Sequence, residues 1–420
     1  MRSNDKVVCG VDVHKKFLVA ALITADGDSI FGRFTNSQSG LLELLQWLLQ
    51  YGCQLVAAES TGVYWYPLFL ALEDHMEVII ANPRQIKAIP GRKTDRNDAQ
   101  WIAELARNGL IKPSRIFRRD DRELRKLTRA RHKLIQERTD HVNRVHQILE
   151  AVGIHLASVV SDIFGKAGQF ILRSLLDGVA IEEIVERIPV ARIKKKKEAL
   201  LDALHTHLGP VDRVLLEQHL EIIQVIDAKV AEIDTEVIAG FVDRRDDLEI
   251  LISIPGIGVT SAVTILAEIG NYRDFPSAEK LAAWCGIVPS VYQSADTLRT
   301  GTITKQGSRQ LRWILVEVAH AAARTKHSAL HRYFMRLKRR IGYLKAIVAL
   351  AHKILRLLWH LLMNREFYEE SHRPEKVKGD LLEDKNLHRR ERSAIALLTR
   401  LNYVITKPRN DIEFKGVQGG

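Results

Sequence analysis

The chain has 420 residues, enough for two to four domains of ordinary size. Its 63 Lys and Arg outnumber 51 Asp and Glu, for a formal net charge of +12, and 46% of the residues are hydrophobic. This composition excludes wholesale disorder, and no uncharged apolar stretch has the length of a membrane span. Three scattered cysteines and an N-terminus without an apolar signal core favour a reducing, cytoplasmic setting over a disulfide framework, a zinc site or secretion.

The N-terminal residues alternate between strand and helix patterns. Runs of β-forming residues predict strands, and apolar residues at helical spacing predict helices. The expected strands are 6–13, 17–24, 29–35, 54–58 and 77–81, and the expected helices are 39–51 and 64–75. Three hairpin-linked strands followed by alternating helices and strands predict a mixed α/β sheet in the order of an RNase H-like fold.

The rest of the chain has mainly helical patterns. Two long apolar stripes predict helices at 118–152 and 215–241, which could pair as an antiparallel coiled-coil arm around an inserted helical segment. A helix-turn-helix is expected at 250–270, a loop at 289–304, and further helices at 278–285, 309–324 and 341–362. These patterns predict four regions: an N-terminal domain (1–112), an arm (113–247), a C-terminal domain (248–362) and a charged extension (363–420).

The positive charge is concentrated in two blocks. Residues 80–150 carry a net charge of +9 and residues 299–360 carry +13, whereas residues 1–79 and 151–298 are acidic, at −4 and −8. The second block contains a single acid, Glu317, although a merely solvated surface usually mixes both signs. Two such blocks on a folded chain indicate binding to the phosphates of nucleic acid.

Four acids have the pattern of a metal site. Asp12 lies within the first predicted strand, and Glu59 directly follows the strand at 54–58, so either carboxylate needs a partner if it is buried. Asp95 and Asp98 are three residues apart and would share one face of a helix. Carboxylates that converge at a sheet edge repel one another, and Mg²⁺, which takes carboxylate oxygens, removes that repulsion. The set predicts a two-metal site for phosphoryl transfer; the alternative is that Asp12 caps a turn and Asp95 caps a helix.

A glycine-containing turn lies between two apolar helical segments. Gly256 and Gly258 allow a tight turn, and N–H groups at the start of the next helix can bind a phosphate. This is the pattern of a helix-hairpin-helix that contacts DNA. An ordinary turn between two helices explains the same residues equally well.

A serine-containing segment follows this turn. No Ser-His-Asp spacing supports hydrolase chemistry around Ser294. The cations that come after it suit a phosphate better than an acyl group, because arginine binds phosphate oxygens bidentately. These cations are Lys305, Arg309 and Arg312.

With these residues in view, the chain resembles the DEDD-type insertion-sequence transposases of the IS-one-ten family, a group that includes Piv-like DNA invertases. The resemblance covers most of residues 6–360 in two blocks. The first block holds Gly-Val-Asp-Val-His-Lys at 10–15, Glu-Ser-Thr-Gly at 59–62 and Lys-Thr-Asp-Arg-Asn-Asp-Ala at 93–99. The second holds Pro-Gly-Ile-Gly at 255–258, Gly-Ile-Val-Pro at 286–289, Ser294, Ile-Thr-Lys-Gln-Gly at 303–307 and Leu-Arg at 311–312.

Two features depart from the family pattern. Ala295 follows Ser294 where the family usually has glycine, which leaves Ser290 as the alternative nucleophile. The tail after about residue 362 has no counterpart that we can match.

The resemblance implies a RuvC-like N-terminal domain, a coiled-coil arm and a mainly α-helical C-terminal transposase domain with the helix-hairpin-helix. It implies that Asp12, Glu59, Asp95 and Asp98 are catalytic acids that bind Mg²⁺ as a two-metal site. It also implies that Ser294 is the nucleophile that forms a covalent phosphoserine link to a cut DNA strand.

The implied partners are donor DNA, target DNA and a structured bridge RNA that pairs with both. The guide would then choose the sequence, while the protein holds the nucleic acid backbones. The resemblance also implies a homodimer that assembles into a homotetramer, without a membrane, in a prokaryotic cytoplasm and in association with the nucleoid. The expected nucleic-acid contacts are Lys15, Arg92, Lys93, Arg96, Gly256, Gly258, Lys305, Arg309 and Arg312.

Two other functions fit part of the pattern. A RuvC-like, metal-dependent, structure-specific nuclease would use water as its nucleophile and leave no covalent adduct. A non-catalytic nucleic-acid-binding protein would keep the basic blocks but would not need four acids.

Overall fold

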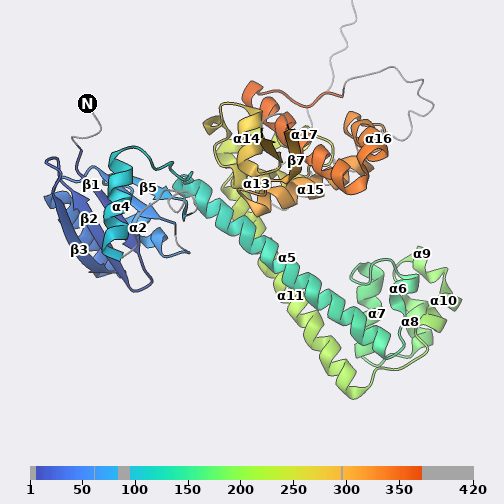
Figure 1. The fold of residues 1–420 in the computed structure, drawn as a ribbon. Coiled ribbons are helices and arrows are strands. Elements are labelled where there is room, and N and C mark those ends of the chain that lie inside the picture. Colours follow the sequence, from blue (N-terminus) through green and yellow to red (C-terminus); the bar gives the residue numbers. More distant parts are fainter. Residues whose placement is uncertain (1–5, 61, 84–94, 295–296, 371–420) are drawn as a thin grey trace, which may run out of the picture. The chain divides into compact units, whose positions relative to one another are not determined.

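A computed structural model describes residues 6–60, 62–83, 95–294 and 297–370. The side chains of residues 95–97 and 291–300 lie outside this description, as does the charged extension from 371 onward. The chain divides into two compact units, Met1–Phe117 and Arg118–Gly420 (Figure 1).

The first unit is built on a five-stranded sheet. The strands are β1 (Val8–Val13), β2 (Phe17–Ile23), β3 (Ser29–Thr35), β4 (Leu55–Glu59) and β5 (Glu77–Ala81). Their order is β3-β2-β1-β4-β5. The first three strands pair antiparallel, whereas β4 pairs parallel with both β1 and β5. The mixed α/β sheet expected from the sequence is confirmed.

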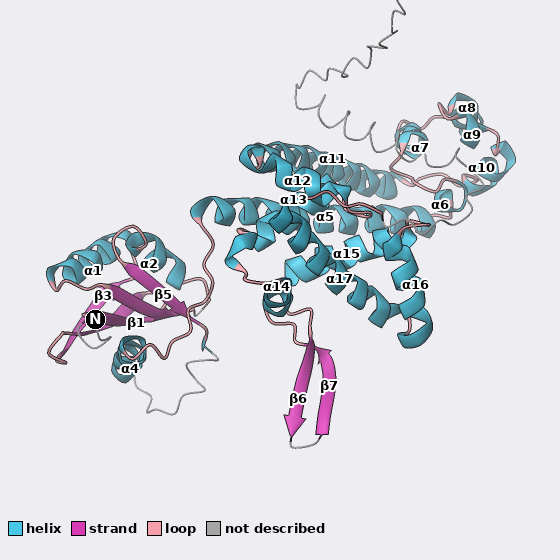
Figure 2. Cartoon of the chain, turned by 90° about the horizontal axis from the view of Figure 1, so that it is seen from above, coloured by secondary structure: helices cyan, strands magenta, loops and turns pink. Residues whose placement is uncertain are grey.

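Helices cover both faces of this sheet. Helices α1 (Gln38–Gln50) and α2 (Trp65–Leu72) lie on one face and α4 (Asp95–Arg107) lies on the other, as Figure 2 shows. Alternate residues of β1 therefore enter different cores: Val11 packs with the α1 and α2 side, and Val8 packs with the α4 side. This alternation follows from the two-residue period of a strand.

The second unit begins with two long antiparallel helices, α5 (Arg119–Ala151) and α11 (Pro210–Ala239), which lie side by side in Figure 1. Bidentate ion pairs join them, from Arg131 to Asp234 and from Arg138 to Asp227. The second helix begins five residues earlier than the apolar stripe predicts, because Pro210 is tolerated in a first helical turn. The helix pair is present, and its supercoiling into a coiled coil stays a prediction.

A small helical bundle closes the far end of this helix pair. It packs around its own apolar core, which also includes Val145 of α5 and Leu216 of α11. Its helices are α6 (Leu156–Val159), α7 (Lys166–Leu176), α8 (Ile181–Arg187), α9 (Ala191–Lys194) and α10 (Lys197–Ala203). The helical segment inserted between the two long helices is thus present as predicted, although the sequence did not predict its individual helices.

The other end of the pair leads into a mostly helical domain. After a short 3₁₀ turn, Val242–Arg244, come α12 (Arg245–Ser253), α13 (Val259–Ile269), the 3₁₀ turn Tyr272–Asp274, α14 (Ala278–Cys285), β6 (Pro289–Ser294), β7 (Thr297–Ile303), α15 (Arg309–Arg324), α16 (Ala329–Ile341) and α17 (Tyr343–Asn364). The helix-turn-helix expected at 250–270 is confirmed as α12 and α13. Helix α16 has no counterpart among the helices expected from the sequence.

The prediction of a loop at 289–304 is wrong. Strands β6 and β7 form an antiparallel hairpin, in which Tyr292 pairs with Arg299 and Ser294 pairs with Thr297. Figure 2 shows this hairpin projecting from the helices around it. A bulge shifts the register between Pro289 and Val291, and this irregularity hides the alternation by which a strand is usually found.

Helix α17 is the one described helix that is long and apolar enough to cross a membrane. Half of its most apolar 18-residue segment is buried inside the protein. Leu350, Ile354 and Leu358 lie in the core of the C-terminal domain, as expected for a core helix.

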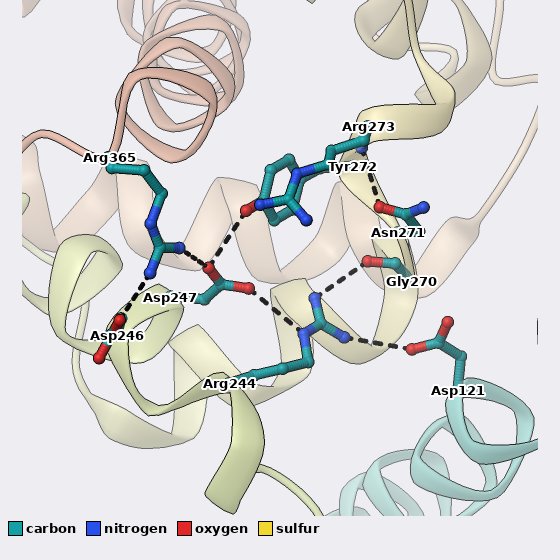
Figure 3. A network of polar contacts seen from close by, with 9 residues as sticks. All are labelled: Asp121, Arg244, Asp246, Asp247, Gly270, Asn271, Tyr272, Arg273 and Arg365. Carbon is teal, nitrogen blue, oxygen red and sulfur yellow. Dashed lines mark hydrogen bonds and ion pairs between the residues drawn. The ribbon is translucent and has the colours of Figure 1, made fainter.

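A polar network ties the ends of several helices together (Figure 3). Arg244 donates to Asp121 at the start of α5, to Asp247 of α12 and to the carbonyl of Gly270 after α13. Asp247 also accepts hydrogen bonds from Tyr272 and from Arg365, the residue that follows α17. The network fixes the point where the long helix pair joins the C-terminal domain.

Candidate active site

Two of the four predicted acids end neighbouring parallel strands. Val11 of β1 pairs with Ala58 of β4, so the next residues, Asp12 and Glu59, lie side by side at the same end of the sheet. Residues at the same level of a parallel pair point to the same face of the sheet. Both side chains are half-buried. The strand register thus brings these two carboxylates to one edge.

Helix α4 covers the face to which these acids belong. Gly10, two residues before Asp12, lies against α4 so closely that a Cβ there would come within 2.1 Å of the Ala99 carbonyl oxygen. Ile102, further along α4, packs on the Val8 end of β1. The first turn of α4 therefore extends toward the Asp12 end of β1.

That first turn carries the other two predicted acids. Asp98 is half-buried, and Asp95 begins the helix, with its side chain outside the described residues. Within the described side chains, which exclude that of Asp95, no three acidic, His or Cys groups lie close enough to hold a metal ion. The donors are all carboxylates, the residue type that suits a hard divalent cation. Metal binding by this set stays a prediction.

His14 lies beside the first acid. Its Nε2 is 3.0 Å from Oδ2 of Asp12, and the two side chains are 35% and 20% exposed. The ring also packs on Phe17, with the centroids 4.4 Å apart. The imidazole therefore lies next to the carboxylate, between Asp12 and Phe17.

The predicted nucleophile belongs to the second unit. Ser294 ends β6 and pairs with Thr297 across the tip of the hairpin, and its side chain lies outside the described residues. The alternative nucleophile, Ser290, sits near the hairpin base, where its Oγ donates to the Thr302 carbonyl at 3.0 Å. A Cβ on Gly301 would come within 2.4 Å of that Oγ, so the strands are close there. Ser290 thus has a structural hydrogen bond.

The three cations after the hairpin differ in their surroundings. Lys305 and Arg309 are exposed, and Lys305 has a left-handed backbone with φ of 55°. Arg312 is half-buried, and its Nη1 donates to the carbonyls of Cys285, Gln306 and Gly307. Arg312 therefore holds the turn that joins the hairpin to α15.

The remaining predicted cations belong to the N-terminal part of the sequence. Lys15 is exposed just after β1. Arg96 lies in the first turn of α4 with its side chain outside the description, and Arg92 and Lys93 lie wholly outside it.

The glycines of the α12–α13 turn have two distinct environments. Gly256 has φ of +95°, and a Cβ there would meet the Ala322 nitrogen of α15 at 2.6 Å. Gly258 is exposed just before α13, and a Cβ there would meet no atom within 4 Å. Close packing on α15 explains Gly256, and only Gly258 faces open space.

One buried acid of the second unit was not predicted from the sequence. Glu268 of α13 is fully buried and accepts hydrogen bonds from Arg125 and Arg129 of α5 and from Ser308, which caps α15. Burial raises the pKa of its carboxyl, but the bonds and charges of these partners outweigh burial and hold the pKa below its ordinary value. The signal was available, since a lone acid in an apolar helix needs partners.

Two family models match the chain. One, a DEDD model for IS110 described as "Transposase", matches residues 9–154, and another, "Transposase IS116/IS110/IS902 family", matches residues 248–335. Together they span more than half of the 420 residues. The chain belongs to this transposase family. As a transposase it acts on DNA, and both the acids of the first unit and Ser294 lie in the matched segments.

The chain is also similar to individual proteins, two described as transposases and one as a gene-inverting protein. The transposase for insertion sequence element IS1111A of Coxiella burnetii is 25% identical over 368 residues, which cover 87% of this chain and 92% of that protein. A probable family 20 transposase of Pseudomonas aeruginosa is 29% identical over 75% of this chain and 85% of that protein. The pilin gene-inverting protein of Moraxella lacunata is 25% identical over 87% of this chain and 99% of that protein.

Among solved structures, T. thermophilus RuvC in complex with a Holliday junction substrate aligns at 17% identity with a TM-score of 0.21. The alignment covers 26% of this chain and 99% of that chain.

Proposed function

We propose that this transposase cuts and rejoins DNA strands through a phosphoserine intermediate, with Ser294 as nucleophile and the four acids as metal ligands. The observation that carries the proposal is the strand register that sets Asp12 beside Glu59, on the face where α4 begins. Two half-buried carboxylates at one sheet edge repel each other unless a cation or a proton intervenes.

The acid set would hold Mg²⁺ through Asp12, Glu59, Asp95 and Asp98. When bound, a divalent cation neutralises these carboxylates and stabilises negative charge on the oxygens of a transferring phosphate. His14 lies beside this set, with its Nε2 3.0 Å from Asp12.

In the proposed strand cut, Ser294 attacks the scissile phosphorus. The bond from its Oγ to phosphorus forms as one bond from phosphorus to a strand oxygen breaks. The serine gives up its proton, and the departing strand oxygen gains one. Rejoining is the reverse step with the hydroxyl of another strand end, so the phosphoserine conserves the energy of the ester bond.

We further propose that a structured bridge RNA pairs with donor and target DNA, and that homodimers assemble into tetramers in the cytoplasm, near the nucleoid. In a tetramer, Ser294 of one subunit could serve the acids of another. The support is the family resemblance together with the two separate basic blocks, each of which suits a nucleic-acid backbone.

A covalent adduct tests the nucleophile. The protein is incubated with Mg²⁺ and labelled donor DNA, and denaturing gels are scanned for DNA attached to protein. We expect an adduct with the native chain and none with Ser294→Ala. Ser290→Ala is the matched control and should keep the adduct, because its hydroxyl is engaged within the hairpin. An adduct that persists in Ser294→Ala but not in Ser290→Ala assigns the role to Ser290.

The same assay separates the other mechanisms. Asp12→Asn should abolish both cutting and adduct while leaving DNA binding intact, since the change removes one charge and little volume. Cutting without any adduct in the native protein would support a water nucleophile. Sequencing of RNA that copurifies with the protein tests the guide: a discrete structured species is expected, and bulk cellular RNA alone would contradict it.

A further inference from the structure

The most uniformly basic part of the described chain surrounds α16. Residues 318–365 contain eleven Lys and Arg and no Asp or Glu. Figures 1 and 2 both show α16 at the edge of the C-terminal domain. Ten of these cations are exposed and precede the end of α17: Arg324, Lys326, Arg332, Arg336, Lys338, Arg339, Arg340, Lys345, Lys353 and Arg356.

Helix α16 presents two different faces. Leu330 and Phe334, four residues apart, are buried in the core of the C-terminal domain. Arg332, Arg336 and Arg340 follow the same four-residue spacing on the exposed side, so they form a row along one face. Because the apolar face is already packed in the protein, α16 cannot lay that face on a membrane surface.

Most of these cations lack the ion pairs that other surface helices have; the exceptions among the described residues are Arg356, which pairs with Glu279 at 2.6 Å, and Arg332. Arg187 pairs with Glu183 in α8, and Arg245 pairs with Glu249 in α12, each one turn apart. On α16, Arg332 has Glu370 at 3.8 Å, whereas Arg336, Arg339 and Arg340 form no ion pair with any described carboxylate. Among the described residues, the row therefore carries a net positive charge, which attracts anions.

Aromatic rings hold part of this surface in place. Tyr333 has the Arg336 guanidinium 5.6 Å from its ring centroid and the Lys353 ammonium at 4.3 Å. Tyr343, 45% exposed, has Lys338 at 5.7 Å from its ring and shares a 3.0 Å hydrogen bond with His320. Cation–π contacts limit the freedom of these side chains, so less ordering is needed when an anion binds.

We infer that α16 and the start of α17 form a binding surface for the phosphate backbone of a DNA duplex, separate from the acids and from Ser294. The row from Arg332 to Arg340 spans about 12 Å at the helical rise, and a duplex carries one phosphate charge per about 1.7 Å of axis. Several phosphates thus lie within reach. Arginine and lysine are the residues that most often contact phosphate oxygens, so we expect this surface to bind the DNA backbone.

The inferred surface depends on DNA being the substrate and not on the serine chemistry. A transposase must hold DNA on both sides of the cut, and binding that does not depend on sequence is appropriate for the duplex that flanks the cut. The inference can therefore fail while Ser294 remains the nucleophile, and the reverse also holds.

The salt dependence of DNA binding provides the test. The affinity of the full chain for a duplex of about 30 base pairs and arbitrary sequence is measured across about 50–200 mM salt. We expect the triple variant Arg336→Gln, Arg339→Gln and Arg340→Gln to bind about tenfold more weakly at intermediate salt. The slope of log affinity against log salt should shrink by about 0.9 for each phosphate that the variant no longer neutralises, or about 2 to 3 in total.

Two controls make the result specific. Arg187→Gln, Arg192→Gln and Arg245→Gln remove the same charge from exposed positions elsewhere and should leave the slope unchanged. Lysine in place of Arg336, Arg339 and Arg340 keeps the charge and should retain most of the slope. The inference is overturned if the α16 and control triples weaken binding equally, or if only binding to an RNA duplex weakens.

Discussion

Gly10 of β1 lies so close to α4 that a Cβ there would be 2.1 Å from the Ala99 carbonyl oxygen and 2.4 Å from the Ala103 nitrogen. This contact sets the distance between helix and sheet, and with it the distance of Asp98 from Asp12. The absence of a side chain at position 10 is therefore a requirement of the acid site as well as of the fold.

We expect Gly10→Val to push α4 away from the sheet. Overpacking against rigid backbone destabilises a protein by about 1–3 kcal/mol, and here it also separates the acids. Urea unfolding and recombination should both be impaired. A variant with the native unfolding midpoint and native activity would show that the contact does not position the site.

The two glycines of the α12–α13 turn should respond differently to substitution. Gly256→Ala strains a backbone at φ of +95° and clashes with α15, so its urea midpoint should fall. Gly258→Ser, at φ of −105° in open space, places a preferred capping residue before α13 and should unfold at or above the native midpoint. Weaker DNA binding by Gly258→Ser alone would assign phosphate contact to the turn, and unchanged binding would leave it structural.

The elements that were predictable from sequence are those with local periodicity. The strands around Asp12 and Glu59 alternate or run continuously apolar, and the long helices carry apolar stripes, so both were found from spacing. Helix α16 was missed because only Leu330 and Phe334 are deeply buried, and its run of arginines resembles a solvated segment. The β6–β7 hairpin was missed because its register is interrupted by a bulge.

The candidate site, too, has parts that sequence patterns predict and parts that they do not. That Asp12 and Glu59 are neighbours follows from the parallel pairing of β1 with β4, whereas the sequence predicted only that the acids could meet at a sheet edge. The closeness of α4 depends on Gly10, whose role as a contact surface no spacing rule reveals. Arg312 is expected from the sequence to contact nucleic acid, and in the structure its Nη1 donates to three carbonyls of the protein chain. A sequence alone does not distinguish an arginine that binds protein carbonyls from one that binds phosphate.

The three cysteines should be unreactive in the native protein. Burial raises the pKa of Cys53 to about 11 and that of Cys285 to about 12, and it also raises the pKa of fully buried Cys9. Because the thiolate is the reacting form, a thiol reagent such as Ellman's reagent at a pH of about 8 should label none of them within minutes. Unfolding in guanidinium should release three reactive thiols. Rapid labelling of the native chain would contradict the burial of these side chains.

Glu268 should make a pH-dependent contribution to stability. Burial raises the pKa of this carboxyl, but the hydrogen bond from Arg129, the charge of Arg125 and the bond from Ser308 prevail and lower it below 4.5. A carboxyl whose pKa is lower in the folded than in the unfolded state stabilises the protein at any pH above its unfolded-state pKa. This contribution is lost as the pH falls through the folded-state pKa. Glu268→Gln leaves two arginines without their buried counter-charge and should cost about 3–5 kcal/mol at neutral pH.

That cost should begin to shrink as the pH falls below about 4.5, where the unfolded chain takes up the proton, and should disappear once the pH is below the lowered pKa of the native carboxyl. Urea unfolding of both proteins at a pH of about 7 and of about 4 measures the difference. Asp227→Asn is the control, because Asp227 pairs with Arg138 while 48% exposed, and loss of a solvated pair should cost at most about 1 kcal/mol. A Glu268→Gln penalty equal to that of Asp227→Asn, or one that grows on acidification, would mean that the charge of Glu268 does not hold α5, α13 and α15 together.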